Sequence, residues 1–344
     1  MEKGDKMSVN GKSFISRRNF LKSSAAGLAL FPAAGMGYRS PDGPVRNSQV
    51  VLVKTGDRKQ GVSQALKLLD LTGANDKRVV VKPNFNTSDD APGSTHNDTL
   101  SQLVYELHER GARDITLGES SGPPNTRGVM EEKGIFDLAQ DSEFGVVNFD
   151  EMPESDWVHF PSAGTHWPEG YYLPRHAVNA EFLVSTCCLK THAYGGVFTM
   201  SLKLAVGLTP KRINGANPRR TMHRSPDMRR MIAELNGGYK PQLIVLDGVD
   251  AFVDGGPSNG ELRKADVIIA GTDRVAVDAV GVAVLKDLGS NEAIMGRKIF
   301  EQEQIQRAVE LGLGVSSPAE IELTTPDAAS RQYAAQLRPI LDQG

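Results

Sequence analysis

The chain has 344 residues, enough for one large α/β domain or two smaller ones, and its composition is ordinary for a soluble globular protein. The formal net charge is -3 and no basic run occurs in the body of the chain, so we expect no nucleic-acid-binding surface. Cys187 and Cys188 are adjacent and are the only two cysteines. We expect both to be buried thiols, and no iron–sulfur cluster held by this chain alone, because such a cluster needs more cysteines.

The amino-terminal segment differs from the rest of the chain. The pair Arg17-Arg18 precedes Phe20-Leu21 and a weakly apolar stretch rich in Ala and Gly. This order resembles a bacterial twin-arginine export signal, whereas a disordered basic tail is the alternative. We expect residues 1–38 to be the signal peptide and 39–48 a linker. The expected location is then periplasmic or extracytoplasmic, with the twin-arginine translocation machinery as a partner. No stable membrane anchor is expected, because the apolar stretch is short.

The first half of the body alternates short apolar runs with segments of helical periodicity. Strands are predicted at residues 50–53, 78–82 and 115–117, and helices at residues 62–71, 98–110 and 127–140, the last interrupted at Gly134. Residues 150–180 break this rhythm, since they are rich in Pro, Gly, Trp and Tyr. They predict antiparallel strands or a long ordered loop, and such an insertion can act as a lid.

Regular alternation returns in the second half. The elements predicted there are a strand beginning at residue 182, a helix at 199–208, a basic loop at 214–224, a helix at 227–235, strands at 243–246, 267–270 and 321–323, and helices at 273–288, 291–311 and 328–341. Such alternation predicts an α/β fold, with a mostly parallel sheet flanked by helices and an inserted irregular or antiparallel subregion. The main domain is expected at residues 49–315, followed by a C-terminal strand and helix at residues 316–344.

Polar or ionisable residues follow five of the predicted strands. These strand ends are Lys82-Pro83-Asn84, Gly118-Glu119-Ser120, Lys190-Thr191-His192, Asp247-Gly248-Val249-Asp250 and Gly271-Thr272-Asp273. In parallel α/β sheets, ligands bind beyond the carboxyl ends of the strands. The pattern therefore predicts a single site rich in Lys, His and carboxylate, which favours an enzyme over a scaffold.

The segment from Lys190 to Lys203 contains the densest set of candidate site residues. A glycine turn, Gly195-Gly196, separates His192 from the predicted helix that carries Ser201. Helix N-termini favour anions, and nearby lysines strengthen that preference. We therefore predict a phosphate or carboxylate site, with the ligand-binding residues Lys82, Asn84, Lys190, Ser201, Lys203 and Asp250. The alternative is that Lys203 is a solvated helix residue and His192 a turn residue.

A basic segment adds charge after this helix. Arg219, Arg220, His223 and Arg224 each read as surface residues alone, but together they would close over an anion. His223 is the stronger candidate for proton transfer, because the reference pKa of histidine lies near neutrality.

Three carboxylates, Glu119, Asp247 and Asp250, are the acidic counterpart. They would either hold a hard divalent cation or act as a general base, and the alternative is capping or neutralisation of lysine. No close pair of metal-ligating histidines is present, so the identity of any metal or other cofactor stays unknown. Asp273 is predicted to cap the helix that follows it, and Asp278 to be a buried pairing residue.

These motifs resemble those of the DUF362 family, a group of uncharacterised bacterial and archaeal proteins. The matching pieces are Val81-Lys82-Pro83-Asn84, Gly118-Glu119-Ser120, Lys190-Thr191-His192, Ser201-Leu202-Lys203, Asp247-Gly248-Val249-Asp250 with Gly256-Pro257, Gly271-Thr272-Asp273 through Asp278, and Arg307 through Gly314. Other members often carry ferredoxin-like cysteine motifs that this chain lacks, and many have Asn where Leu204 stands. The resemblance implies a fold and no established reaction.

The first functional hypothesis is an exported enzyme that acts on a small anionic metabolite. Its lysines would bind the anion, and its catalytic residues would be His192, His223, Asp247 and Glu119. The alternative is a periplasmic anion-binding or cofactor-binding protein, or an accessory redox protein, that uses the same lysines without catalysis.

Overall fold

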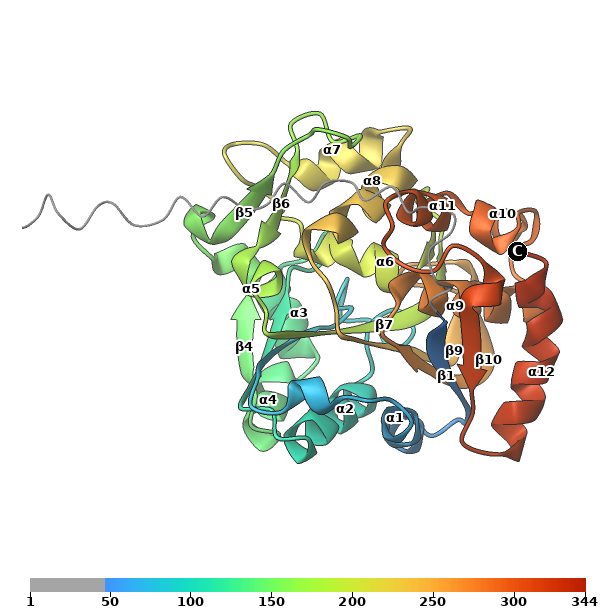
Figure 1. Cartoon of the computed structure of the whole chain (residues 1–344). Coiled ribbons are helices and arrows are strands. Elements are labelled where there is room, and N and C mark those ends of the chain that lie inside the picture. The colour runs from blue at the N-terminus through green and yellow to red at the C-terminus, as the bar shows by residue number, and fades with distance from the viewer. Residues whose placement is uncertain (1–46) are drawn as a thin grey trace, which may run out of the picture. The chain divides into compact units, whose positions relative to one another are not determined.

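The computed structural model describes residues 47–344 and has a nine-stranded sheet at its centre (Figure 1). The predicted signal peptide and most of the predicted linker lie outside the described residues. Along the sheet the strands are β11 (Ile321–Thr324), β1 (Ser48–Lys54), β10 (Gly260–Gly271), β9 (Leu243–Gly255), β7 (Phe182–His192), β2 (Arg78–Lys82), β3 (Asp114–Glu119) and β4 (Gly145–Asn148), with β8 (Val197–Thr199) paired to β7.

Most strand pairs are parallel, as the alternation of strands and helices predicts. The pairs β1–β11, β2–β3, β2–β7, β3–β4 and β7–β9 are parallel, whereas β10 runs antiparallel to both β1 and β9. The prediction that five strand ends meet at one edge is therefore wrong for β10. Its carboxyl end, with Asp273, lies at the opposite edge, because β9 and β10 form one long hairpin. Asp273 caps the next helix as predicted, accepting hydrogen bonds from the N–H groups of Val275 and Ala276.

Four helices pack on one face of the sheet (Figure 1). They are α1 (Arg58–Lys67), α2 (Asn97–Glu109), α3 (Thr126–Glu132) and α4 (Ile135–Asp141). Strand β1 shows why both faces are covered: Val51 and Val53 pack toward these helices, and Val50 and Leu52 pack toward the other face. The predicted interruption at Gly134 is confirmed, because this residue has φ 64° and separates α3 from α4.

The opposite face carries a larger set of helices. They are α6 (Ser201–Leu204), α7 (Pro218–Arg224), α8 (Met228–Leu235), α9 (Arg274–Asp287), α10 (Glu292–Met295), α11 (Glu303–Glu310) and α12 (Ala328–Asp342). Short 3-10 turns complete the fold, at η1 (Thr72–Ala74), η2 (Phe149–Glu151), η3 (Glu154–Asp156), η4 (Ala205–Leu208), η5 (Asn236–Gly238), η6 (Ile299–Glu301) and η7 (Pro318–Glu320). The C-terminal strand β11 joins the main sheet beside β1, and α12 packs against α9, so residues 316–344 belong to the same body.

The predicted antiparallel subregion is a two-stranded sheet. Strands β5 (Trp157–Phe160) and β6 (Tyr171–Pro174) pair antiparallel and lead into α5 (Arg175–Val178). The apolar side chains of this sheet share a core with α7 and α8, and the indole N–H of Trp167 donates to the Met231 carbonyl. None of the residues from 150 to 180 lines the cleft described below. The cleft lining therefore gives no support to the predicted lid.

Two predicted elements differ in detail. The predicted helix at 199–208 is the end of β8 followed by α6 and η4, because Asp278 starts a new helical turn at Ser201. The predicted loop at 214–224 contains α7, which begins at Pro218 with Asn217 as its cap. In the part of the chain that the structure describes, no helix has the length and apolarity needed to cross a bilayer.

Candidate functional site

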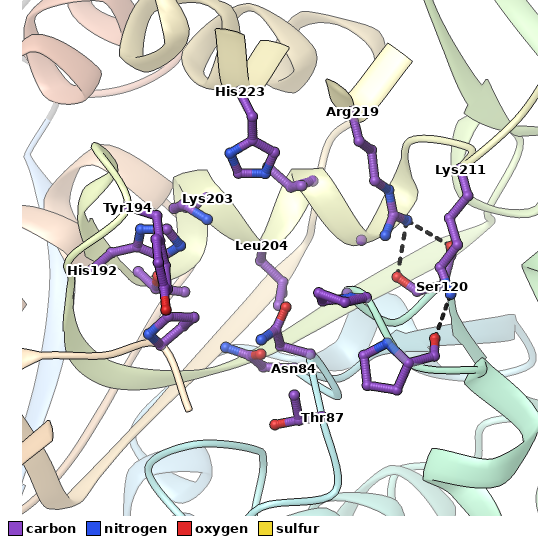
Figure 2. Close-up of a pocket in the computed structure, with 18 of the residues that line it drawn as sticks. Asn84, Thr87, Ser120, His192, Tyr194, Lys203, Leu204, Lys211, Arg219 and His223 are labelled. Atoms are coloured by element: carbon purple, nitrogen blue, oxygen red, sulfur yellow. Dashed lines mark hydrogen bonds between the residues drawn. The ribbon is translucent and has the colours of Figure 1, made fainter. Parts of the chain in front are cut away.

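A cleft of about 930 Å³ opens where β2, β3 and β7 end, beneath α7 and beside α6 (Figure 2). It combines the loops after three parallel strands with the tip of the β9–β10 hairpin. Its lining residues are Lys82, Asn84, Asn86, Thr87, Glu119, Ser120, Gly122, Pro123, Pro124, Lys190, His192, Tyr194, Thr199, Lys203, Leu204, Val206, Gly207, Lys211, Arg212, Asn217, Arg219, Arg220, His223, Pro257 and Ser258. The predicted residues Lys82, Asn84, Glu119, Lys190, His192, Lys203 and His223 therefore meet in one place.

The cleft is strongly cationic although the chain as a whole is weakly acidic. Seven Lys and Arg side chains line it, against Glu119 as the one carboxylate of the lining. The field of such a set attracts anions and disfavours the folded state when no anion is bound. What each cation does depends on whether the protein already supplies it with a partner.

Lys82 is paired with Glu119 at the floor of the cleft. The Lys82 Nζ lies 2.7 Å from Glu119 Oε1, and both side chains are buried. Glu119 also accepts hydrogen bonds from the N–H groups of Phe85 and Ser120. Burial lowers the pKa of Lys82, and the Glu119 carboxylate partly opposes that change. The backbone of η4 covers the pair at Gly207, where an added Cβ would lie 2.6 Å from both charged atoms.

Lys190 is held by backbone carbonyls. Its Nζ donates to the carbonyl oxygens of Gly93 and Pro257, the latter at 2.9 Å and at the tip of the β9–β10 hairpin. Burial lowers the pKa of Lys190 to about 8. The side chain thus fixes two loops at the rim while its charge still contributes to the cleft.

Lys203 differs from both of these lysines. It projects from α6 into the cleft, and no hydrogen bond or ion pair links its Nζ to any residue from 47 to 344. Burial, helped by the charges of Lys190 and Arg219, lowers its pKa to about 7. Gly196 makes room for it, since a Cβ there would lie 2.7 Å from Lys203 Cε and 2.9 Å from His192 Nδ1. The neutral amine of Lys203 is therefore far more accessible near neutral pH than that of an ordinary lysine.

Two histidines neighbour Lys203. His192 is buried, and its Nδ1 has no hydrogen-bond partner among the described residues. Burial, then the charges of Lys203, His223 and Lys190, lower its pKa to about 2, so it stays neutral. His223 lies on α7, and partial burial together with Lys203 and Arg219 lowers its pKa as well. A neutral imidazole at the mouth of the cleft is able to accept a proton.

Three arginines complete the cationic lining. Arg219 is buried and donates to the carbonyl oxygens of Thr209, Ser120 and Ser121 and to Ser120 Oγ, so it positions the loop after β3. Arg212 and Arg220 are exposed, and no side-chain hydrogen bond or ion pair links either guanidinium to another described residue. They are therefore available to a ligand.

The cleft lies within a region that matches a protein-family model. The family is DUF362, a domain of unknown function, and the match covers residues 79–283, more than half of the chain. The chain belongs to the DUF362 family. Its fold and the cleft described above are therefore those of a member of a family without an assigned activity.

Two named proteins are similar to this DUF362 protein. A thylakoid-associated protein from Synechocystis sp. is 25% identical over 212 residues, which are 61% of this chain and 63% of that protein. The lactate racemase apoprotein from Thermoanaerobacterium thermosaccharolyticum has 14% identity and a TM-score of 0.42, with 86% of this chain and 88% of that chain covered.

Ser201 was predicted to bind the ligand, but it does not line the cleft of this DUF362 protein. The N–H groups of Ser201 and Leu202 donate to the carboxylate of Asp278, at 2.8 and 2.9 Å. Burial raises the pKa of Asp278 to about 7, although these two bonds oppose the change. The amino end of α6 therefore already holds a carboxylate of the protein, and the prediction that it binds a ligand anion is wrong.

Asp247 and Asp250 also lie away from the cleft. Both accept from the guanidinium of Arg58 at 2.8 Å, on the face of the sheet covered by α1. Asp250 also pairs with Lys264. The predicted strand end at Asp247 is in fact the middle of β9, which continues to Gly255. Their assignment to the site is therefore wrong, and they form a buried ion-pair network.

The donor set does not fit a divalent metal. Within residues 47–344 no group of three or more His, Cys, Asp or Glu side chains is placed to hold a metal ion. Glu119 is engaged by Lys82, and the two aspartates lie elsewhere. Cys187 and Cys188 are buried free thiols, as predicted, and burial raises the pKa of Cys188 to about 11.

Several lining residues were not predicted from the sequence. Lys211 and Arg212 follow Pro210 directly, and this adjacent basic pair could have indicated two further residues of the cationic cleft. Lys211 pairs with Asp150 at 2.9 Å, so only Arg212 is left unneutralised. Tyr194, which is 72% exposed, and Thr199, whose hydroxyl has no partner among the described residues, lie on either side of the glycine turn. No pattern in the sequence marks either of them.

Proposed function

We propose that this DUF362 protein is an enzyme that acts on a small anionic metabolite, a carboxylate or a phosphate, in the cationic cleft. One observation carries the proposal. Lys203, Arg212 and Arg220 line the cleft without an acidic partner among the described residues. Uncompensated cations repel one another and destabilise the fold, so their presence together is best explained by a ligand that supplies the negative charge.

The remaining polar groups suit an anion with several oxygen atoms. Asn84 Nδ2 is buried at the cleft without a hydrogen-bond partner in the described part of the chain, and it is a donor. Arg212 and Arg220 offer planar donor sets that match carboxylate and phosphate geometry. Lys82 and Lys190 support the floor and the rim, since protein acceptors already bind them.

Proton transfer is the chemistry that this arrangement supports. The pKa of Lys203 is lowered to about 7, so this side chain can take up or give up a proton near neutral pH, and the neutral imidazole of His223 is a proton acceptor beside it. A bound anion activated by the arginines would lose or gain a proton at the group nearest to these two side chains. His192 remains neutral and shapes the pocket, which removes it from the candidates for proton transfer.

A second candidate function is anion binding without catalysis. It is favoured by the location of Asp247 and Asp250, because the structure removes two of the predicted acid–base groups from the site. The two functions are separated by the role of His223. In an enzyme His223→Gln lowers turnover, whereas in a binding protein it leaves ligand affinity within about twofold and there is no turnover to lose.

Calorimetric titration with pyrophosphate tests the anion site. We expect Lys203→Met and Arg220→Gln each to weaken binding by about tenfold, the loss of one charge-assisted contact. Lys240→Met is the matched control, because Lys240 is exposed and lies outside the lining. Equal affinity in all variants, or no binding by the parent protein, would refute the anion site. Incubation with a panel of phosphate and carboxylate metabolites, followed by NMR detection of products, then tests catalysis.

We also propose that the protein is exported through the twin-arginine translocation machinery to the periplasm or another extracytoplasmic location. The support is the order of Arg17-Arg18, Phe20-Leu21 and the weakly apolar residues that follow. Changing both arginines to lysine is expected to retain the protein in the cytoplasm, which cell fractionation measures. Unchanged fractionation of this variant would exclude the pathway.

A further inference from the structure

We propose that Lys203 forms a Schiff base with an anionic carbonyl substrate, an oxo acid or a phosphorylated aldehyde or ketone. This inference rests on the proposed anion-binding function and names the substrate class and the group that reacts. It is carried by the environment of the four cleft lysines: three of them are bound by protein acceptors, and one has no such acceptor in the described part of the chain.

The occupied lysines have fixed acceptors. Lys82 is paired with Glu119, Lys190 donates to two carbonyl oxygens, and Lys211 contacts Asp150 and a further carbonyl. A nitrogen held in this way must break those contacts before it attacks a substrate. Lys203 has no such contact within residues 47–344, and its Nζ opens into the cleft.

The surroundings of Lys203 also favour the neutral amine, which is the nucleophilic form. It is buried, and the charges of Lys190 and Arg219 lower its pKa further, while no carboxylate among the described residues pairs with it. This is the arrangement that activates lysines for Schiff-base chemistry, namely burial combined with neighbouring cations. Arg212 and Arg220, which line the cleft without an acidic partner among the described residues, would hold the anionic end of the substrate.

The step balances without an oxidant or a reductant. The nitrogen lone pair of Lys203 forms a bond to the carbonyl carbon, and the C=O π electrons move to oxygen. One proton moves from the nitrogen to the oxygen and gives a carbinolamine. A second proton then converts its hydroxyl to water, which leaves as C=N forms, and the nitrogen gives up its remaining proton, so both amine protons end in the water. His223 neighbours Lys203 closely enough for their charges to interact, and its imidazole can take each proton from the nitrogen and pass it to the oxygen.

Reductive trapping tests the proposal on the full-length protein. Glyoxylate carries a carboxylate beside an aldehyde, and sodium cyanoborohydride reduces any imine to a stable secondary amine. Peptide mapping by mass spectrometry then locates the carboxymethyl group. We expect Lys203 to be labelled roughly tenfold or more above every other lysine at pH 7, because an ordinary lysine is almost wholly protonated there. The labelling rate should rise through pH 7.

Several controls keep the result specific. Glycolaldehyde, which has no negative charge, should label Lys203 at least about fivefold more slowly than glyoxylate, since the cationic cleft concentrates anions. Lys203→Arg should lose the label at this position, and Lys240→Met should keep it. Mapping the parent protein needs no variant, so a misfolded substitution does not obscure the answer.

Two results would overturn the inference. One is labelling spread evenly over lysines, or centred on Lys190. The other is equal labelling by glyoxylate and glycolaldehyde, which removes the anionic substrate class. If pyrophosphate binds but Lys203 is not trapped, the Schiff base fails alone and the anion site stands. If pyrophosphate does not bind, the proposed function itself fails.

Discussion

Replacement of Lys203 by methionine is expected to stabilise the free protein while it weakens ligand binding. In the fold the pKa of Lys203 falls from 10.5 to about 7, because the ammonium is buried beside other cations. That difference corresponds to about 4 kcal/mol of unfavourable free energy at pH 7. The cleft is open and water solvates part of the charge. We therefore expect Lys203→Met to recover about half of this free energy, so that its unfolding free energy exceeds that of the wild type by about 2 kcal/mol. Met keeps most of the apolar length of the side chain.

The pH dependence of this gain gives the sharper measurement. The folded pKa lies below the unfolded one, so the unfolded chain binds more protons between about pH 7 and pH 10.5 and wild-type stability rises with pH over that range. The advantage of Lys203→Met should be full below pH 7 and should shrink toward zero near pH 10. Urea unfolding at several pH values, with Lys240→Met as control, measures it. A variant that is less stable than wild type by about 1 kcal/mol at pH 7, or a gain that does not vary with pH, would refute the reasoning.

Two further experiments probe the structural role of Asp247 and the charge of Lys203. Asp247→Asn removes the negative charge beside the Arg58 guanidinium and leaves one acceptor oxygen, and because Arg58 keeps its second carboxylate we expect a loss of about 2–3 kcal/mol in urea unfolding with unchanged pyrophosphate affinity. The exposed control Asp114→Asn should cost less than about 0.5 kcal/mol, and a tenfold drop in affinity for Asp247→Asn would return this residue to the site. Sulfate keeps its charge from pH 6 to pH 9, so its affinity should fall by roughly tenfold over this range as Lys203 loses its proton, and a flat profile would contradict the lowered pKa.

The fold class could be predicted from local pattern, and so could much of the cleft. Buried strands between amphipathic helices leave few topologies, and parallel strands bring their carboxyl ends to one edge. That is why Lys82, Glu119, Lys190 and Lys203 were expected together and are found together. The direction of each strand could not be predicted, because a buried apolar run has the same pattern in a parallel and in an antiparallel strand. The hairpin of β9 and β10 was therefore not predicted, and neither was the position of Asp273 at the opposite edge of the sheet.

Only the tertiary structure decided which charged groups are free. The sequence by itself determined that lysines, histidines and carboxylates follow the strands, but ion pairing depends on contacts between residues far apart in the chain. Asp247 meets Arg58 across 189 positions, and Asp278 meets Ser201 across 77. Contacts of this kind hold three predicted site residues, Asp247, Asp250 and Ser201, outside the cleft, whereas Lys203 has no partner among the described residues. A charged side chain that pairs with another residue stabilises the fold, whereas one that faces the cleft without a partner is able to bind a ligand.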